Sequence, residues 1–486
     1  MTQEYTVQIN KSSSYPIVAP QNPTTPNQTW HLGTRVNTTP GVLPELTNLN
    51  YLNVEVDEIS STVLTTNTGF GTSAADTVFT IVRCLGNLTI NSGITVTAAA
   101  RKLGLMLYVQ GDLILNGTNT TGATITMSAR GANHNGTTVS GFTSVYPGRN
   151  IRVFNGVYYP VSLDALTFSV TLNATNINVT DNTILIPNHG LVTGQEIRVT
   201  GSVPTGLTAN QHYFVIKVDD NKIQVASSYA NATSTTPVPI DITGTSSGTM
   251  SVSYVKVNKS SVLSQNINLG NSGGGGGESS QNLGTDGSAG SIGTCGGGGS
   301  GSMNNVSGEI PLRAGNGAAG TTFSGGSGGG GRANNSNTIT GFDLLKHDGS
   351  PNGGAGGEGS AYYARAFSTG GSGNLAGVGG LAGQANYPAS MSNSGTGGCL
   401  VIVVSGTLFI RGVSTISSNG SNSIGSDDGG GGGSSGGGSI TILAGNYMIS
   451  PQYEFLVNGG TAAGGAGGSL RGGNGGMGSI QLGGFV

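Results

Sequence analysis

The sequence predicts an all-β protein of β-helix-like stacked rungs, with an inserted small β barrel or sandwich module and a glycine-rich bundle of polyglycine II helices. Three observations lead to this fold class. Short runs of alternating apolar residues recur between glycines, a denser block of alternation interrupts them, and most of the 89 glycines follow residue 270. Alternation with a period of two is the pattern of a β-strand.

The rungs are predicted from a phrase that occurs twice, at residues 104–131 and again at residues 398–420. In each copy, glycines separate short strand-like runs. Repeated strand–glycine units are typical of stacked coils, and glycine suits a turn that needs a positive φ or a close backbone approach. We therefore expect structural roles at the turns for Gly104, Gly111, Gly117, Gly406, Gly412 and Gly420.

Changes in composition predict the domain organisation. Residues 1–65 are rich in Pro, Asn and Thr and are expected to form an extended arm, because X-Pro pairs favour extended or turn backbone. The other predicted units are a first rung domain at 66–165, an inserted β module at 166–257, a polyglycine II region at 258–397, and closing rungs with a glycine-rich C-terminus at 398–486.

The glycine tracts have four interpretations. A flexible linker would require a costly loop closure inside a chain that resumes the same strand phrase. Collagen needs glycine at every third position with abundant proline, and the tracts break that register. A phosphate loop needs a βαβ context. We favour packed polyglycine helices with three residues per turn, whose backbone groups pair between segments, and the GGAGGE spacing at 353–358 fits them.

Composition also limits the partners. Charged residues make up 8 % of the chain and the net charge is −3, so the sequence has no basic footprint for nucleic acid. The first residues lack the basic and apolar blocks of a signal peptide. No apolar run approaches the roughly 18 residues of a membrane span, so no membrane insertion is expected.

The sequence contains no recognisable catalytic motif, so we expect no enzyme activity, catalytic residue, metal or cofactor. No histidine has ligand spacing to another metal-binding residue, and three widely separated cysteines, Cys84, Cys295 and Cys399, form no disulfide framework. Two GxSxG matches, at 325–329 and 433–437, lack the strand–helix context of a nucleophile elbow. A non-adjacent pair of catalytic carboxylates stays an open alternative.

Large aromatic side chains interrupt the glycine tracts. They either plug the bundle or sit on exposed loops, where aromatics are good anchors for sugars or protein surfaces. The candidate receptor-binding residues are Tyr362, Tyr363, Phe367 and Tyr387.

Several segments resemble phage proteins. Residues 104–113 (GLMLYVQGDL) and 127–132 (MSARGA) look like the opening of glycine-rich phage virion and tail proteins, and residues 397–486 look like their closing part. Residues 188–195 (NHGLVTGQ) and 223–226 (IQVA) resemble a small β module of phage tail fibres. The glycine tracts are similar to the polyglycine-helix domain of long-tail-fibre adhesins of T-even-like phages.

The resemblance implies a phage virion protein, a tail fibre or receptor-binding component, made in the host cytoplasm and displayed on the particle surface. It implies that the N-terminal arm docks to other virion proteins and that loops bind a host-surface glycan or outer-surface protein. We expect a homo-oligomer, a trimer being one arrangement. The alternatives are a capsid or tail decoration protein, an extracellular filament subunit, and a polysaccharide depolymerase.

Overall fold

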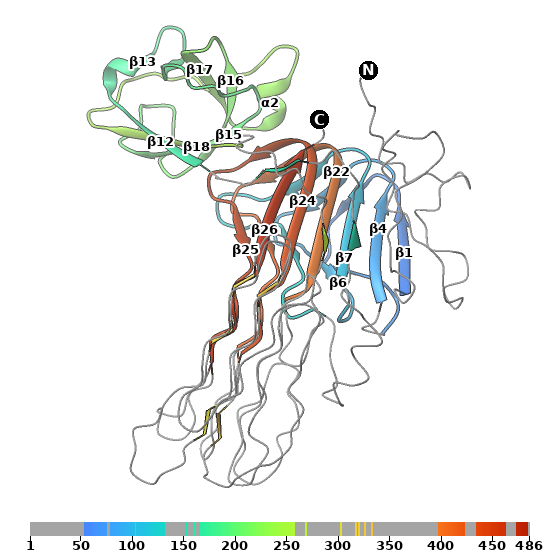
Figure 1. Ribbon diagram of the computed structural model, residues 1–486. Helices are drawn as coiled ribbons and strands as arrows, with labels where there is room; N and C mark the ends of the chain where they lie inside the picture. The colour runs from blue at the N-terminus through green and yellow to red at the C-terminus, as the bar shows by residue number, and fades with distance from the viewer. Residues whose placement is uncertain are drawn as a thin grey trace.

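The computed structural model describes most of the coils and the module, and parts of the glycine-rich segments (Figure 1). The described residues are 53–74, 78–102, 104–131, 151–152, 159–161, 166–257, 268–269, 302–303, 316–317, 319–320, 325–326, 332–333, 397–422, 434–462 and 473–484. Apart from the short helical turns η2 (Ala174–Asn176) and α2 (Tyr229–Thr233), their regular structure is β-strand. The predicted all-β class is confirmed.

Successive coils of the chain each add one strand to a long parallel sheet. The strands of this first face, in spatial order, are β1 (Asn53–Ile59), β4 (Val78–Cys84), β7 (Gly104–Val109), β22 (Cys399–Arg411), β24 (Ser439–Ile449) and β26 (Ser479–Gly484). The two copies of the sequence phrase meet here, because Leu105 of β7 pairs with Leu400 of β22. The chain therefore leaves the stack after β9 and resumes it at β22, in register.

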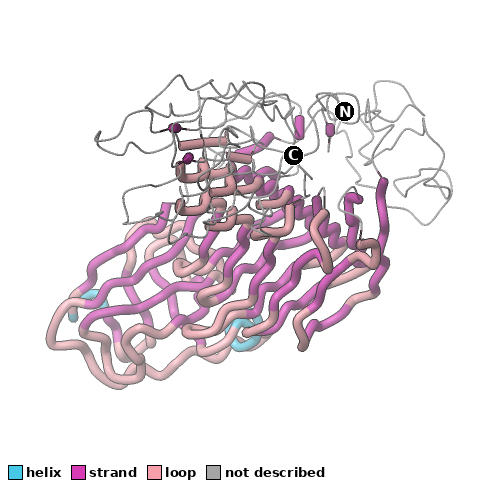
Figure 2. The backbone as a smooth tube through the Cα atoms, turned by 90° about the horizontal axis from the view of Figure 1, so that it is seen from below, coloured by secondary structure: helices cyan, strands magenta, loops and turns pink. Residues whose placement is uncertain are grey.

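Two more stacks of parallel strands complete each coil (Figure 2). The second face contains β2 (Thr62–Leu64), β5 (Leu88–Asn91), β8 (Leu113–Asn116) and the second halves of β22 and β24. The third face contains β3 (Thr68–Phe70), β6 (Thr95–Ala98), β9 (Thr124–Thr126), β23 (Thr415–Ser417) and β25 (Glu454–Leu456).

The core of the coils consists of columns of apolar side chains, one from each coil. Paired positions on the three faces give the columns Leu107, Ile402, Ile442 and Leu482, then Ile90, Leu115 and Ile410, then Val96, Ile125 and Ile416. Every one of these side chains is fully buried. At about 25 cal/mol per Å² of apolar surface, such columns are the main stabilisation of the stack.

Short polar side chains link consecutive coils at the corner between the first two faces. The Ser61 hydroxyl accepts the Asn87 peptide N–H at 2.9 Å, and the Asn87 amide oxygen accepts the Asp112 N–H at 2.9 Å. The Asp112 carboxylate then accepts the Thr407 N–H at 2.8 Å. Each side chain satisfies a backbone donor that a turn leaves unpaired.

The inserted module is a separate antiparallel sheet with its own core. Its seven strands, in spatial order, are β12 (Leu166–Leu172), β18 (Met250–Lys256), β15 (Glu196–Gly201), β16 (His212–Lys217), β17 (Lys222–Ala226), β14 (Thr183–Leu185) and β13 (Ile177–Asn178). All seven strands belong to one sheet that packs on a single core, which favours the barrel over a sandwich of two sheets. The first and last strands fall at the predicted limits of 166–257.

Two pairs of short strands lie outside these two bodies, and one further strand joins the coils. Where the chain enters and leaves the module, β10 (Ile151–Arg152) pairs with β19 (Asn268–Leu269). On the first face of the coils, β11 (Tyr159–Val161) adds an antiparallel strand to β26. The second pair is β20 (Ser302–Met303) with β21 (Arg332–Ala333).

The predicted boundary between arm and rungs is wrong. Strands β1 and β2 lie inside the range 1–65 assigned to the arm, so the coils begin at Asn53. Glu55 and Asp57 make β1 look like a polar segment, yet both carboxylates have partners far along the chain. Asp57 accepts the Gly71 N–H, and Glu55 is paired with Lys102.

Candidate functional site

The glycine-rich segments of the described residues form a hydrogen-bonded lattice beside the coils. We define the glycine lattice as residues 397–398, 418–422, 434–438, 457–462 and 473–478, with the short stretches 316–317, 319–320 and 325–326. The chain enters it directly after the third face, after β23 and β25. It returns directly into β24 and β26 on the first face, and these segments extend beyond the coils in Figure 1.

Hydrogen bonds in the lattice repeat every three residues. Residues 434 and 437 donate their N–H groups to the carbonyls of 473 and 476, each at 3.0 Å. Between them, residues 435 and 438 donate to a different segment, at residues 421 and 418. A segment that turns to the same neighbour every third residue has the threefold symmetry of a polyproline II-type helix. These segments have the three-residue period expected of polyglycine II, but most of them lie at 418–478, beyond the range 258–397 predicted for that structure.

The three-residue period also appears in the hydrogen bonds of two other segment pairs and in the burial of residues 473–478. Residues 475 and 478 donate to 460 and 457, and residues 317 and 320 donate to 474 and 477. Along 473–478, Gly473 and Gly476 are buried whereas Asn474 and Met477 are exposed. Each turn of this segment therefore presents one side chain to solvent, as expected for packed helices with three residues per turn.

Glycine is required in the lattice because neighbouring backbones are in contact. A Cβ built on Gly437 would lie 2.6 Å from the carbonyl carbon of Val457 and 2.9 Å from the Gly478 nitrogen. A Cβ on Gly475 would lie 2.5 Å from the carbonyl carbon of Ser435. These are backbone atoms, which cannot rotate away, so the segments could not approach this closely with any larger residue.

Asparagine side chains join adjacent lattice segments. The Asn419 amide oxygen accepts the Asn458 N–H at 2.7 Å, and three residues later the Asn422 oxygen accepts the Thr461 N–H at 2.7 Å. Sequence reasoning missed these two residues. The signal that could have found them is the three-residue spacing of two asparagines in a glycine- and serine-rich stretch.

The predicted structural glycines occupy several kinds of position. Gly104 starts β7 and lies within a strand, whereas Gly420 lies in the lattice against residues 435 and 436. Gly111, Gly117 and Gly412 lie at turns of the coils, whereas Gly406 lies at a register shift inside β22. Gly412 has a φ of +59°, and a Cβ on any of these four glycines would contact backbone or side-chain atoms of an adjacent coil.

The four aromatic candidates for receptor binding, Tyr362, Tyr363, Phe367 and Tyr387, lie outside the described residues. Their receptor-binding role stays a prediction.

A buried polar cluster joins the module to the coils. Glu196 and His212 start β15 and β16, and their side chains are 5 % and 4 % exposed. The Glu196 carboxylate accepts the Gly412 N–H at 2.9 Å and contacts His212 Nδ1. His212 Nε2 lies 2.6 Å from the Gln452 side-chain oxygen. Sequence reasoning also missed this cluster, because its members are far apart in the chain: His212 and Gln452 are 240 residues apart.

An arginine packs beside this cluster among three aromatic rings. The Arg411 guanidinium carbon lies 4.7 Å from the Tyr229 ring centre, 5.2 Å from Phe409 and 5.8 Å from Phe214. Two of these rings belong to the module and one to the coils, so the cation–π contacts cross the junction. Burial lowers the pKa of Arg411, and the Glu196 charge opposes that shift.

A buried ion pair anchors the first turn of the coils. The Lys102 ammonium is fully buried and lies 2.7 Å from Glu55 Oε1. The same carboxylate accepts hydrogen bonds from the Thr80 hydroxyl at 2.6 Å and the Ser73 N–H at 2.9 Å. Burial raises the pKa of Glu55, but Lys102, Thr80 and Ser73 together outweigh it and hold the pKa below 4.5.

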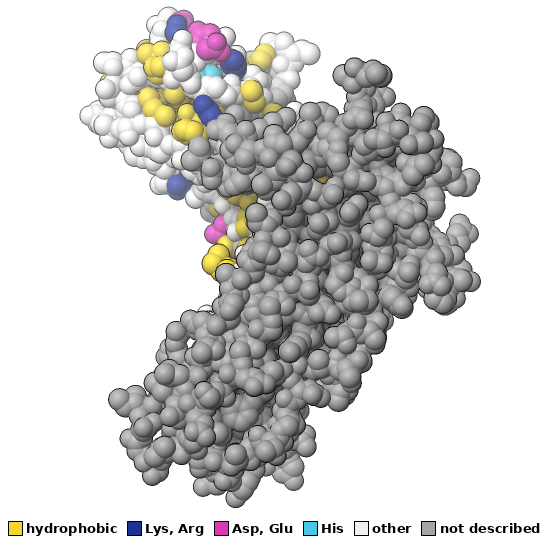
Figure 3. All heavy atoms as spheres, viewed as in Figure 1, with side chains coloured by type: hydrophobic (Ala, Val, Ile, Leu, Met, Phe, Trp, Pro, Cys, Tyr) yellow, Lys and Arg dark blue, Asp and Glu magenta, His cyan; other side chains and the backbone are white. Residues whose placement is uncertain are grey.

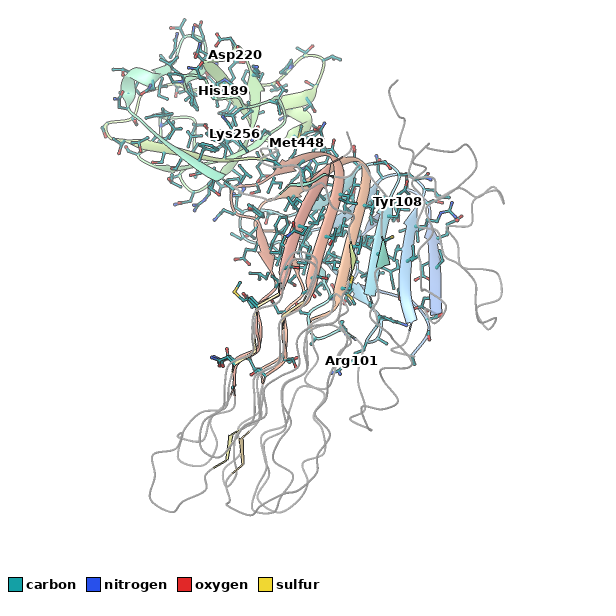
Figure 4. The ribbon with its side chains drawn as sticks, in the orientation of Figure 1. Arg101, Tyr108, His189, Asp220, Lys256 and Met448 are labelled. Carbon is teal, nitrogen blue, oxygen red and sulfur yellow. The ribbon has the colours of Figure 1, made fainter. Side chains whose placement is uncertain are left out.

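The side chains of His189, Cys84 and Cys399, which could carry chemistry elsewhere, are buried within the fold. Figure 4 shows His189 inside the module, below Asp220. Its Nε2 lies 2.8 Å from the Asp219 carbonyl, and its Nδ1 accepts the Leu191 N–H. Burial raises the pKa of Cys84, and raises the pKa of Cys399 to about 12. Of the two GxSxG matches, the second lies mostly in the glycine lattice, at residues 434–437.

Within the described ranges, no three His, Cys, Asp or Glu side chains gather as metal ligands. The helices described there are too short to cross a membrane. The surface of the module in Figure 3 is mainly uncharged, with scattered Lys, Arg and acidic side chains. Comparison with models of known families, with curated proteins and with solved structures gives no match.

Proposed function

We propose that this protein is a phage virion component, a tail fibre or receptor-binding protein that holds recognition loops on a rigid glycine lattice. The observation that carries the proposal is the three-residue hydrogen-bond period of the lattice. Ordering glycine costs about 0.5–1 kcal/mol more per residue than ordering alanine. When several glycine-rich segments are ordered despite this entropic cost, the chain gains a stiff support that contains few charged residues.

Continuity between the lattice and the coils also supports the proposal. Lattice segments begin at residues 418 and 457, immediately after coil strands, and end at residues 438 and 478, immediately before them. Residues that connect outgoing and returning segments are therefore held at both ends by backbone hydrogen bonds. Loops positioned by a rigid scaffold are common binding elements.

On this proposal, the particle-facing end includes residues 1–52, ahead of the first coil, and recognition involves Tyr362, Tyr363, Phe367 and Tyr387. The ligand is a host-surface glycan or outer-surface protein. Several copies on one particle would make weak contacts strong through multivalency. No catalytic step is proposed.

The test is binding of the purified, fluorescently labelled chain to a panel of bacterial strains. We expect labelling of the host strain and its loss in the Tyr362→Ala, Tyr363→Ala double variant. Val218→Ala is the matched control, because Val218 is a 50 % exposed module residue remote from the glycine-rich region in sequence.

Three outcomes would contradict the proposal. Absence of labelling together with a regular array of the protein on particles would indicate a decoration protein. Undiminished labelling by the double variant would show that Tyr362 and Tyr363 do not contribute to recognition. Release of reducing sugar from host envelopes would indicate a depolymerase.

A further inference from the structure

The imidazole of His212 faces an oxygen atom on each side. Its Nδ1 contacts the Glu196 carboxylate, and its Nε2 lies 2.6 Å from the Gln452 side-chain oxygen. The Ser450 hydroxyl lies 3.4 Å from Nδ1. A neutral imidazole has one donor nitrogen and one acceptor nitrogen, whereas the protonated ring has two donors. Two facing oxygens therefore match the protonated ring better.

The charged and titratable groups around this ring come from both bodies. Glu196 faces it from β15 of the module, and Arg411 acts on Glu196 from β22 of the coils. Tyr229 of α2 packs on Arg411 and interacts with it electrostatically. When His212 loses its proton, the buried Glu196 carboxylate loses the positive charge of the ring, although a neutral ring with its proton on Nδ1 still donates a hydrogen bond to it. The charge of Arg411 and the Gly412 N–H remain as its other favourable partners.

We propose that this contact is a pH-sensitive latch that holds the module on the coils most tightly when His212 is protonated. A buried carboxylate without a neighbouring cation is costly to keep in the junction. Protonation of His212 places a cation beside the Glu196 carboxylate. Loss of the proton as the pH rises removes that ion pair and lowers the stability of the junction, so the junction opens more often and exposes the Gly412 N–H to solvent. The latch concerns the attachment of the module and is independent of the proposed receptor-binding role.

The Gly412 peptide N–H reports the latch directly, because its acceptor belongs to the module. Hydrogen exchange of the full chain is followed by mass spectrometry and corrected for the intrinsic pH dependence of exchange. Protection of Gly412 is expected to be about tenfold or more lower at about pH 8 than at about pH 5. The Gly406 N–H, which donates to Gly111 within the coils at 3.0 Å, is the internal control and should keep constant protection.

Two variants separate the latch from general stability. His212→Gln keeps a hydrogen-bonding side chain without a titratable ring, and Glu196→Gln keeps the size of the acid without its charge. Both should make Gly412 protection independent of pH while Gly406 stays protected, which also shows that the coils have folded. Constant Gly412 protection in the wild type, or an unchanged pH dependence in His212→Gln, would overturn the proposal.

Discussion

Replacing Gly437 with alanine should destabilise the glycine lattice strongly. Gly437 lies in segment 434–438, all of whose residues are buried. The new methyl group would lie 2.6 Å from the Val457 carbonyl carbon and 2.9 Å from the Gly478 nitrogen. Because both atoms are backbone, the segments must move apart to accept it.

The magnitude follows from the contacts that would change. Overpacking of this kind costs about 1–3 kcal/mol. The Gly437 N–H donates to Gly476 at 3.0 Å and its carbonyl accepts from Gly326 at 2.8 Å, and weakening both hydrogen bonds costs about 1 kcal/mol each. The lower entropy of an unfolded alanine returns about 0.4–1 kcal/mol. The expected net loss of unfolding free energy is about 2–5 kcal/mol.

Urea unfolding gives the loss of stability, and hydrogen exchange of residues 434–438 shows that the loss is in the lattice. Met477→Ala is the matched control, because this side chain is in the same lattice but 56 % exposed. It should change stability by no more than about 0.5 kcal/mol. Equal stability of Gly437→Ala and wild type would refute close backbone packing around this residue.

Three further predictions concern single side chains. Asn419→Ala removes the acceptor of the Asn458 N–H and should cost about 1 kcal/mol in urea unfolding, whereas an unchanged midpoint would mean that the contact contributes nothing. Cys399, with its pKa raised to about 12 by burial, should resist iodoacetamide at neutral pH until the protein unfolds, and modification in the native state would contradict its burial. The folded pKa of Glu55 is lowered, so its stabilisation is present above pH 4.5 and is lost as the pH falls through the folded value. In Glu55→Gln, the unfolding free energy should therefore fall less steeply as the pH is lowered. An acid-unfolding curve identical to that of the wild type would argue against the Lys102 ion pair.

Elements that depend on local pattern could be predicted from the sequence. Alternating apolar residues and glycines predicted the coil strands around 104–131 and 398–420, because the strand period is a property of consecutive residues. The module limits at 166–257 followed from a local change in glycine content. The three-residue lattice period followed from glycine-rich composition, since only glycine allows backbones to pack so closely.

The start of the coils could not be predicted in this way. Glu55 and Asp57 make β1 look like part of the polar arm, because their partners lie at Lys102 and Gly71. A carboxylate in a strand is compatible with the fold only when a cation or peptide N–H meets it. Whether this condition is met depends on Lys102 and Gly71, which lie outside the local sequence pattern of β1.

Tertiary structure alone decided which segments are neighbours. Glycines have no side chains that distinguish one lattice segment from another, so the pairing of 475 with 460 and of 317 with 474 depends on where the coils place each segment. The same is true of His212 and Glu196, which meet Gln452 and Gly412 only because the module is seated on the coils. Local pattern sets backbone conformation, whereas these contacts depend on the spatial arrangement of distant segments.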